Sequence, residues 1–483
     1  MSVTPLPQGH RPSQTKIVAT VGPASTGQTA LADLILAGVD VFRINTAHGD
    51  RQEHQQRLDA IREASRAVEL PVGVLVDLPG PKIRLGELPG GEVQCLPGAR
   101  LRFVRGHTPT GPDELTTTYE PLVDELDAGD RVMLADGTVS LVVEESGPDY
   151  ATCRVVQPGS VRSRQGVNLP GVRLAVPTLG EVDRQNAVWA AENGIDFVGL
   201  SFVRSAEEVV ELKSLLVSHG SGAQVIAKIE KPEALDNLTA IIEASDGVMV
   251  ARGDLGVEID IARTAIVQKQ IIAAASRLRK PAIIATQMLD SMQHSRLPTR
   301  AEVTDVANAI LDGADACMLS GETAIGQHPV EAVEMMHRIA LATEPICRTQ
   351  SPLPGPDLEA DAVDQVTEAT AHAAGRLAES LDARMVVVAS ATGETALSLS
   401  KNRNFVPTVG VSDSEATLRR MCLYWGVIPL AGAPTGESAK LLRHVTRWGY
   451  AAGLLTAGDR IVLLTGSDVT GKTHNMIQVH EVE

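Results

Sequence analysis

Two acidic residues with a basic neighbour indicate metal-dependent phosphoryl chemistry. Glu230 follows Lys228 by two positions in the run 224–230, and Asp254 lies in the Gly-containing run 250–256. If residues 224–230 form a strand, Lys228 and Glu230 lie on one face of it. Carboxylate oxygens suit Mg²⁺, which completes its octahedron with water and substrate oxygens. A metal with cations around it can balance the charge of a phosphoryl group during its transfer.

Each of these residues also has an ordinary structural interpretation. Lys228 and Glu230 on one strand are equally compatible with a structural ion pair. Asp254 follows a Gly, where an Asp commonly caps a helix. Arg43 alone fits a surface or interface position, and His48 alone fits a loop histidine.

Short apolar runs predict the elements that position these residues. Such runs alternate with segments of helical apolar spacing, for example 261–280, with Ile261, Ile266, Ile271, Ile272 and Leu278. This alternation is typical of a parallel sheet buried on both faces, and eight repeats predict a (β/α)8 barrel. The predicted strands are residues 16–21, 39–44, 72–77, 195–201, 224–230, 247–252, 281–286 and 316–320.

Two further regions interrupt or follow this pattern. Residues 82–173 carry short alternating runs with dense Gly and Pro, which predicts an inserted β-rich lid domain. After the Pro-rich segment 351–360, a helix at 361–381 and strands at 384–390, 407–412 and 460–466 predict a separate α/β domain. The predicted organisation is an N-terminal tail (1–13), the barrel (14–81 and 174–349), the lid (82–173) and a C-terminal α/β regulatory domain (355–483).

Polar residues gather at the ends of the predicted strands, where (β/α)8 barrels place their active sites. Seven of the eight strands end in groups of compatible chemistry, which favours a functional site over isolated structural roles. These residues are Arg43, Asn45 and His48; Asp77, Lys82 and Arg84; Ser201, Phe202 and Arg204; Lys228 and Glu230; Arg252, Gly253 and Asp254; Thr286 and Gln287; and Ser320, Gly321, Glu322 and Thr323.

Composition narrows the classes of partner. The net charge is −17, from 60 acidic and 43 basic residues, which argues against general nucleic-acid or membrane binding. A local basic cluster can still bind an anionic substrate. The five cysteines form no CxxC pair, and no apolar run approaches the roughly 20 residues of a membrane span. We therefore expect a cytoplasmic protein with reduced thiols and without nucleic-acid or membrane partners.

Several stretches resemble the pyruvate kinase family, and the resemblance extends from about residue 14 to the end. It implies a (β/α)8 barrel, a β-rich lid inserted after strand three and an α/β C-terminal domain, usually assembled as a homotetramer. It also implies the glycolytic reaction of phosphoenolpyruvate and ADP to pyruvate and ATP. The stretches that carry it are TKIVATVGPAS (15–25), IAKIEKPEAL (226–235), VMVARGDLGVEI (248–259), ATQMLDSM (285–292), the segment 298–333 with its SGET motif, and WGVIPL (425–430).

The resemblance implies roles for the phosphate side of the site. Glu230 and Asp254 resemble the ligands of Mg²⁺, or of Mn²⁺ in its place. Lys228 resembles the lysine that contacts the transferring phosphoryl group, and Arg43 the arginine that binds the substrate phosphate. The residues expected on the nucleotide side are Asn45, His48 and Arg84.

The resemblance also implies how the rest of the substrate is handled. The backbone at Gly253 and Asp254, with Thr286, resembles the cradle of the substrate carboxylate. Thr286, with Ser320 and Glu322 behind it, resembles the route of the proton to the enolate.

The chain departs from the usual family pattern near the monovalent cation. Ala47 stands where many members have a Ser that binds this cation. Lys82 stands where many have a Glu, five residues after Asp77, which resembles the branch whose lysine ammonium replaces K⁺. With Asn45 and Asp77 nearby, Lys82 is expected to make potassium unnecessary.

The lid departs as well. Ala135 and Asp136 replace a pair of aspartates, and Gln165, beside Arg164, replaces the expected lid lysine. Arg164 is a candidate substitute, but Arg and Lys differ in geometry. The sequence therefore does not decide which lid residues, if any, contact the nucleotide.

A loop in the C-terminal domain suits an anion. Residues 390–395 place small hydroxyl residues around a Gly at a predicted helix start, where N–H groups attract anions. In the family this position holds a regulatory sugar phosphate, although an ordinary helix cap fits too and Glu394 carries an opposing charge. Lys401 and Arg403 follow closely. The expected phosphate-binding residues are Ser390, Thr392, Gly393 and Thr395.

Two rival functions remain at this stage. One is another Mg²⁺-dependent barrel enzyme that acts on pyruvate enolates, which needs neither the lid nor the C-terminal domain. The other is a catalytically weakened regulatory relative, which the departures at Ala47, Ala135 and Gln165 keep open. An assay for ADP-dependent pyruvate formation separates all three.

Overall fold

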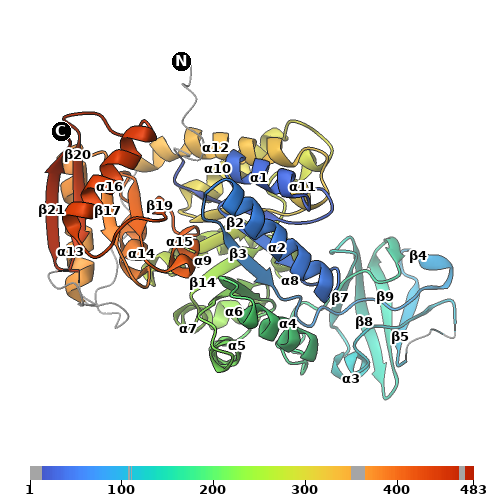
Figure 1. Cartoon of the computed structure of the whole chain (residues 1–483). Coiled ribbons are helices and arrows are strands. Elements are labelled where there is room, and N and C mark those ends of the chain that lie inside the picture. The colour runs from blue at the N-terminus through green and yellow to red at the C-terminus, as the bar shows by residue number, and fades with distance from the viewer. Residues whose placement is uncertain (1–12, 107–108, 110, 350–364, 467–473) are drawn as a thin grey trace.

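The structure is a computed structural model that describes residues 13–106, 109, 111–349, 365–466 and 474–483. The predicted tail, apart from residue 13, and the Pro-rich segment 351–360 lie outside the described residues. Figure 1 shows three parts in a row, with the barrel between the lid and the C-terminal domain. Among the described helices, none combines the length and apolar character that crossing a membrane requires.

The central part is a closed barrel of parallel strands in the order β1-β16-β15-β14-β13-β12-β3-β2, which confirms the predicted (β/α)8 barrel. Each predicted strand agrees with an observed one to within two residues at either end. The strands are buried because their branched side chains fill the interior and helices cover the outside. Their bounds are Lys16–Thr20 (β1), Val41–Asn45 (β2), Gly73–Asp77 (β3), Phe197–Leu200 (β12), Gln224–Ile229 (β13), Gly247–Ala251 (β14), Ala282–Ala285 (β15) and Ala316–Leu319 (β16).

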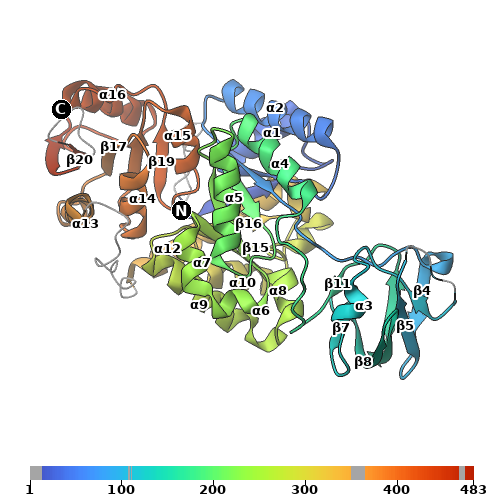
Figure 2. The same ribbon diagram turned by 90° about the horizontal axis from the view of Figure 1, so that it is seen from below.

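Helices follow the barrel strands and form its outer layer (Figures 1 and 2). Several begin at a polar cap. Asp50 accepts from the N–H of Glu53 at the start of α2, and Thr299 and Glu302 form a capping box on α10. The helices are Gln28–Ala37 (α1), Arg51–Ala67 (α2), Glu181–Glu192 (α4), Ala206–Ser218 (α5), Pro232–Asp236 (α6), Leu238–Ala244 (α7), Arg252–Glu258 (α8), Thr264–Arg277 (α9), Arg300–Leu311 (α10), Gly321–Ala324 (α11) and Pro329–Thr349 (α12), with 3₁₀ turns at Ile261–Arg263 and Asp290–Gln293.

The helical prediction for 261–280 needs a correction at its start. Ile261 lies in a 3₁₀ turn before α9 and is 79% exposed, and Ile266 is 56% exposed on the outer face of the helix. Only Ile271 and Ile272 are fully buried among the isoleucines used for that prediction. Apolar spacing alone overstated the buried face, because Ile261 precedes the helix and Ile266 points away from the core.

Aspartates secure the N-terminal end of the barrel. Four barrel strands, β2, β12, β14 and β16, each have an aspartate directly before their first residue. These aspartates are Asp40, Asp196, Asp246 and Asp315. Each carboxylate accepts a hydrogen bond from a backbone N–H near the start of the preceding strand in the barrel, so it fixes two strands relative to each other. The donors are Ile17, Val74, Val225 and Ala282, at 2.8, 2.9, 2.8 and 2.8 Å.

The lid is a separate β-rich part at the opposite end of the barrel from the C-terminal domain (Figure 2). It contains a six-stranded sheet in the order β11-β7-β8-β9-β5-β6 and a two-stranded sheet of β10 and β4. Its elements are Glu92–Cys95 (β4), Arg100–Val104 (β5), Glu114–Leu115 (β6), Leu122–Glu125 (α3), Arg131–Leu134 (β7), Val139–Gly147 (β8), Tyr150–Gln157 (β9), Gly159–Arg162 (β10) and Val167–Asn168 (β11), with a 3₁₀ turn at Pro89–Gly91.

The C-terminal domain has the predicted α/β class, and the strands of its sheet lie in the order β19-β18-β17-β20-β21. The strand β21 is antiparallel to β20, and the others are parallel. The described part of the helix predicted at 361–381 is α13. The elements are Gln365–Ser380 (α13), Met385–Ala389 (β17), Glu394–Lys401 (α14), Thr408–Val411 (β18), Glu415–Met421 (α15), Val427–Leu430 (β19), Ser438–Ala451 (α16), Arg460–Thr465 (β20) and Met476–Glu481 (β21).

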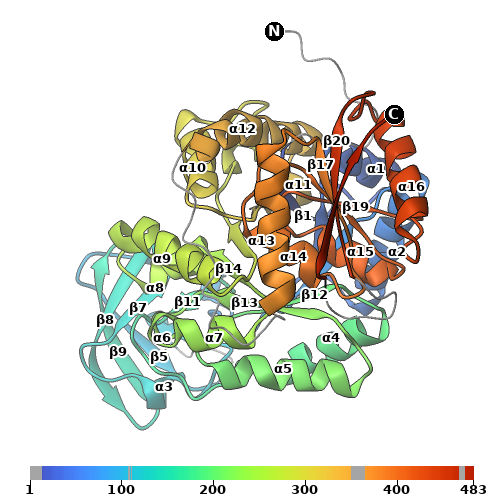
Figure 3. The same ribbon diagram turned by 90° about the vertical axis from the view of Figure 1, so that its left-hand side faces the viewer.

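This domain packs against the N-terminal end of the barrel, and Figure 3 shows it from that side. Barrel residues such as Phe197 and Met249 share one hydrophobic cluster with Met421 and Tyr424 of the C-terminal domain. The apolar core therefore continues from the barrel into the C-terminal domain, and the opposite end is left for the lid and for chemistry.

Candidate active site

Neighbouring strands bring Arg43, Asp77 and Lys228 together at the C-terminal end of the barrel. Asp77 Oδ2 accepts hydrogen bonds from Arg43 Nε at 2.8 Å and from Arg43 Nη2 at 2.6 Å. Its other oxygen, Oδ1, lies 3.2 Å from Lys228 Nζ. Burial acts to raise the pKa of Asp77, but the charges of Lys228 and Arg43 outweigh it and lower that pKa below its usual value. Asp77 is thus an ionised anchor between two cations.

The ammonium of Lys228 is buried and fully coordinated. Besides Asp77, it contacts Glu230 Oε1 at 3.1 Å and donates to Ser201 Oγ at 2.6 Å. Burial disfavours its charge, yet the carboxylates of Asp77 and Glu230 prevail and raise the pKa of Lys228 above the usual value. Lys228 therefore stays cationic in a site with little water, where its charge interacts strongly with an anion.

The two predicted metal ligands lie on adjacent barrel segments. Glu230 directly follows β13 and accepts from the N–H of Phe202 at 2.7 Å through Oε2. Asp254 lies in the first turn of α8, after β14, and its Oδ1 accepts from Lys82 Nζ at 3.0 Å. Burial raises the pKa of Glu230, and the nearby charge of Asp254 adds to that effect although Lys228 opposes it. A buried carboxylate with a second carboxylate nearby is a donor set that a hard cation would stabilise.

Thr286 lies beside Gly253 in a strained backbone conformation. Its φ is 68°, in the left-handed region that β-branched residues rarely adopt. Two hydrogen bonds hold it there: Gly253 N donates to Thr286 Oγ1 at 2.8 Å, and Arg252 Nη2 donates to the Thr286 carbonyl at 2.7 Å. Strain that the surroundings maintain is common where a side chain must be presented to a ligand.

Ser320 and Glu322 lie together behind the mouth of the barrel. Glu322 is buried, and its carboxylate accepts from the N–H groups of Ser320 at 2.7 Å and Leu289 at 2.9 Å. Burial raises the pKa of Glu322 although these N–H groups oppose the change. The hydroxyl of Ser320 is buried without a hydrogen-bond partner among the described residues. The hydroxyl of Thr286 bonds with Gly253, so no hydrogen bond in the described part of the chain joins it to Ser320.

The residues expected on the nucleotide side lie at the outer rim. His48 is exposed, and Asn45 Oδ1 accepts from the N–H of Ala47 at 3.1 Å. Arg84 lies in the segment that enters the lid, where it bridges to Gly166 and donates through Nη1 to the carbonyl of Arg164 at 3.2 Å. The structure therefore places Arg84 with the lid, apart from the Arg43–Lys228 cluster.

The departures in the lid lie in two turns. Ala135 and Asp136 adopt positive φ values of 51° and 53°, and Arg164 has a φ of 65°. Arg164 Nε donates to Glu87 at 2.7 Å, and Gln165 Oε1 accepts from the N–H of Arg162 at 2.7 Å. In this arrangement both side chains bond within the lid.

Lys82, expected with Asn45 and Asp77 nearby, directs its ammonium to a carboxylate at the mouth of the barrel. Its ion pair is with Asp254, while Asp77 pairs with Arg43 and Lys228. The carboxylate of Asp254, one of the two predicted metal ligands, therefore positions this ammonium.

The loop 390–395 is held by its own hydroxyls. Ser390 Oγ accepts from the N–H of Gly393 at 3.0 Å, and Thr392 Oγ1 accepts from Glu394 at 3.4 Å. Gly393 takes a φ of 92° as the N-cap of α14, which favours glycine. Thr395 Oγ1 hydrogen-bonds with His474 Nδ1 at 3.0 Å.

Two basic residues associated with this loop in the sequence point elsewhere. Lys401 Nζ lies 2.8 Å from Asp315 Oδ2, and Arg403 Nη2 lies 3.0 Å from Asp315 Oδ1, at the N-terminal end of the barrel. Proximity in sequence was misleading because α14 carries Lys401 away from the loop. Their role is to join two domains.

Sequence reasoning missed Thr20, which accepts from Arg43 Nη1 at 3.1 Å. It named Ser201 and Asp77 at strand ends but not their contacts: Ser201 accepts from Lys228, and Asp77 bridges the two cations. The order of strands in the barrel could have revealed these contacts, because Thr20 ends β1 beside Arg43 of β2, and β3, which ends in Asp77, lies between β2 and β12.

Comparisons with known proteins agree with this arrangement. The family descriptions "Pyruvate kinase, barrel domain" and "Pyruvate kinase, alpha/beta domain" match residues 12–333 and 368–480. The chain is 39% identical over 475 residues to a pyruvate kinase of Geobacillus stearothermophilus, covering 97% of this chain and 80% of the relative. It is 39% identical over 470 residues to one of Mycobacterium tuberculosis, covering 97% and 98%.

A solved structure supports the same assignment over the whole chain. The crystal structure of a pyruvate kinase from Cryptosporidium parvum matches with a TM-score of 0.89 at 32% identity, covering 98% of this chain and 97% of that one. Relatedness at this identity and coverage, with both family descriptions matched, leaves no competing fold family. The chain belongs to the pyruvate kinase family of phosphotransferases, which use ADP as acceptor in glycolysis.

Proposed function

We propose that the mouth of the barrel transfers the phosphoryl group of phosphoenolpyruvate to ADP through the residues described above. One observation carries this proposal: Asp77 holds Arg43 and Lys228 side by side, with Lys228 also 3.1 Å from Glu230. Two cations fixed next to a carboxylate pair suit a phosphate group that arrives with a divalent metal.

The cations divide the work on the substrate. Arg43 binds the phosphate of phosphoenolpyruvate, and Lys228 stabilises the charge on the phosphoryl group as it moves. Asp77 keeps both side chains in place before substrate arrives, so little reorganisation is needed during the reaction.

Glu230 and Asp254 would hold Mg²⁺, or Mn²⁺ in its place. Among the described residues, no three His, Cys, Asp or Glu side chains are arranged to hold a metal. Two protein carboxylates suit Mg²⁺, because this ion takes its other ligands from water and phosphate oxygens. The bound ion supplies charge neutralisation at the phosphoryl oxygens. Lys82, which pairs with Asp254 at 3.0 Å, adds a fixed positive charge.

The remaining residues handle the enolate. The backbone at Gly253 and Asp254, with Thr286, binds the carboxylate of the substrate. Thr286 delivers a proton to the methylene carbon of the enolate, and Ser320 and Glu322 supply that proton from behind. The geometry supports this role, because Glu322 is buried directly behind Ser320 and accepts from its N–H at 2.7 Å, and burial raises the pKa of its carboxyl.

A coupled assay tests the function directly. Purified protein with phosphoenolpyruvate, ADP and Mg²⁺ is expected to form pyruvate only when all three are present. Absence of ADP-dependent pyruvate would overturn the proposal and favour a weakened regulatory relative.

We further propose that K⁺ is not required, because the ammonium of Lys82 replaces it. The same assay with potassium exchanged for a tetraalkylammonium salt is expected to show little loss of turnover. The variant Lys82→Glu is expected to make turnover depend on K⁺. A wild-type enzyme that loses most of its turnover without K⁺ would sink this idea.

A sugar monophosphate is the proposed effector at loop 390–395. Its phosphate would replace the hydroxyls of Ser390 and Thr392 as acceptor for the N–H groups of Gly393 and Glu394, and Thr395 adds a hydroxyl. Titration of sugar phosphates at low phosphoenolpyruvate tests this, and a flat response to all of them would count against it.

The nucleotide is proposed to bind at Asn45, His48 and Arg84. Following the family, we also propose a homotetramer in the cytoplasm, which light scattering after size exclusion would check; exposed apolar residues such as Ile261 and Ile266 are candidates for burial between subunits. The proposed domain boundaries are 14–81 with 174–349, 82–173 and 355–483.

A further inference from the structure

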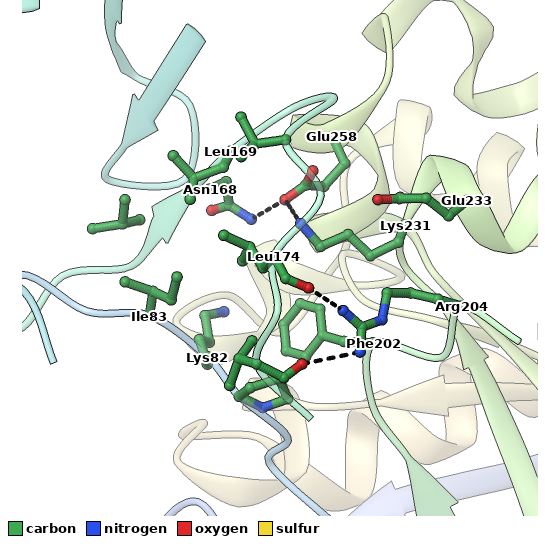
Figure 4. Close-up of a pocket in the computed structure, with 14 residues that line it drawn as sticks. Lys82, Ile83, Asn168, Leu169, Leu174, Phe202, Arg204, Lys231, Glu233 and Glu258 are labelled. Carbon is green, nitrogen blue, oxygen red and sulfur yellow. Dashed lines mark hydrogen bonds and ion pairs between the residues drawn. The ribbon is translucent and has the colours of Figure 1, made fainter. Parts of the chain in front are cut away.

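The lid and the barrel meet at a buried cluster around Glu258 (Figure 4). Glu258 Oε1 accepts from Asn168 Nδ2 of the lid at 3.1 Å and from Lys231 Nζ of the barrel at 2.8 Å. The side chain of Glu258 is only 1% exposed, and Asn168 and Lys231 are buried as well. One carboxylate oxygen therefore joins the two parts of the molecule.

The two barrel partners in this cluster are continuous with the candidate metal ligands. Glu258 is the last residue of α8, whose first turn carries Asp254. Lys231 directly follows Glu230. Glu258 is thus connected through one short helix to Asp254, and through its ion pair with Lys231 and one peptide unit to Glu230.

Asn168, the partner of Glu258 in the lid, belongs to the main sheet of the lid. Asn168 ends β11, where it pairs with Met133 of β7 in the six-stranded sheet. The adjoining turn of the lid also approaches α8: a Cβ built on Gly137 would lie 3.5 Å from the side chain of Val257. The lid sheet therefore contacts the last two residues of α8, Val257 and Glu258.

A second set of hydrogen bonds fixes residues 174–176, the segment that leads from the lid back to the barrel. Arg204 donates to the carbonyls of Leu174 at 2.8 Å and Val176 at 3.0 Å, as Figure 4 shows for Leu174. Between this contact and the Glu258 cluster is a cavity of about 30 Å³, lined by apolar side chains that include Phe202. The backbone N–H of Phe202 binds Glu230, so the same cavity wall supports a metal ligand.

We propose that Glu258 is a positioning residue that couples the position of the lid to the segments carrying Glu230 and Asp254. Since the coupling concerns the metal and nucleotide of the phosphoryl transfer, it rests on the proposed function. A buried hydrogen bond to a charged group is worth more than a neutral one, and its loss leaves the remaining partners unsatisfied. A substitution in the lid should therefore change metal binding at Glu230 and Asp254.

The variant Asn168→Ala tests this from the lid side, where it removes no charge and touches no metal ligand. We expect the KM for ADP and the Mg²⁺ concentration for half-maximal activity each to rise about 10-fold, the scale of one hydrogen bond to a charged group. The KM for phosphoenolpyruvate should change less than about 2-fold, because Arg43 and Lys228 are anchored by Asp77 instead.

The variant Glu258→Met and the double variant establish whether Glu258 is the link, because methionine removes both acceptor oxygens. If the effects of Asn168 pass through Glu258, the double variant Asn168→Ala/Glu258→Met should be no worse than Glu258→Met alone. Additive effects would overturn the coupling. The matched control is Glu233→Met, which removes one carboxylate from the same cavity wall and leaves both hydrogen bonds of Glu258 in place; its kinetics should equal those of the wild type.

Hydrogen exchange measured by mass spectrometry provides a readout that does not depend on turnover. In Asn168→Ala, exchange should increase both in 173–178 and in 252–258, the latter in the barrel. Faster exchange confined to the lid, with an unchanged Mg²⁺ requirement, would overturn the coupling. An inactive wild-type enzyme would instead overturn the proposed function and leave the exchange result to decide the coupling.

Discussion

Each end of the barrel has a buried aspartate next to two cations, but Asp315 and Asp77 are held differently. At the N-terminal end, Asp315 accepts from the backbone N–H of Ala282 as well as from Lys401 and pairs with Arg403. At the C-terminal end, Asp77 is held only by the side chains of Arg43 and Lys228 among the described residues.

This difference separates a structural ion pair from a functional one. A backbone N–H cannot turn away from its acceptor without breaking the strand, so Asp315 and its cations form a permanent joint between domains. Side-chain donors can be redirected at modest cost, so Arg43 and Lys228 can exchange part of their contact with Asp77 for a substrate phosphate. Buried side-chain atoms without a hydrogen-bond partner among the described residues occur at both ends, including Ser320 Oγ at the C-terminal end and Arg403 Nε at the N-terminal end. The contrast therefore rests on how the two carboxylates are held.

The largest effect expected from this comparison is on turnover. Lys228→Met should lower kcat by about 10²–10³-fold, because it removes a preorganised cation from the phosphoryl site. Lys401→Met, which removes an equally buried lysine at the other end, should leave kcat within about 3-fold of wild type at temperatures where it is folded. The coupled assay at saturating substrate measures both, and similar losses in the two variants would erase the distinction.

The next effect is on stability. Asp315→Asn keeps an acceptor for Ala282 but leaves Lys401 and Arg403 buried without a counter-charge, so the free energy of unfolding should fall by about 3–5 kcal/mol. Urea unfolding can be followed by the fluorescence of Trp425, whose ring lies 4.7 Å from the Arg403 guanidinium. In the exposed pair of Arg184 with Glu211, the same acid-to-amide change, Glu211→Gln, should cost less than about 1 kcal/mol. Equal losses would show that Asp315 makes no special contribution.

A pH dependence distinguishes the structural end further. Burial lowers the pKa of Lys401 to about 8, against the opposing charge of Asp315. Between that value and the ordinary 10.5, the unfolded chain binds more protons at this residue than the folded chain. The stability of the wild type relative to Lys401→Met should therefore rise as the pH increases from about 8 to 10.5. Unfolding curves of both proteins across this window test the sign, and a falling difference would contradict it.

The smallest expected effect concerns the strained residue at the mouth. Thr286→Ser keeps the hydroxyl that accepts from Gly253 but removes a methyl group at a φ of 68°, so stability should rise by less than about 1 kcal/mol. Thr323→Ser, in the helix α11, should instead be slightly destabilising because its methyl group is buried. Thermal unfolding midpoints compare the two, and a loss of stability in Thr286→Ser would show that packing of the methyl group outweighs the strain.

Much of the barrel was predictable because its strands are buried on both faces. Runs such as 224–230 and 247–252 are continuous in apolar residues and have few alternative structures, and the polar residues that end them identified Lys228, Glu230 and Asp254. The aspartates before four strands were also visible, as VDVF (39–42), IDFV (195–198), SDGV (245–248) and ADAC (314–317), but their common role was overlooked. Each depends on a neighbouring strand that is distant in sequence.

The sequence by itself determined the succession of strands and helices, the class of each domain and the residue types available at the strand ends, because these depend on local periodicity and composition. Only the tertiary structure decided the partners. It placed Asp77 between Arg43 and Lys228, sent Lys82 to Asp254, turned Lys401 and Arg403 towards Asp315, and joined Asn168 to Lys231 through Glu258. Ion pairs and hydrogen bonds act over about 3 Å, and such distant residues come within that range only when the barrel closes and the other two domains pack against it.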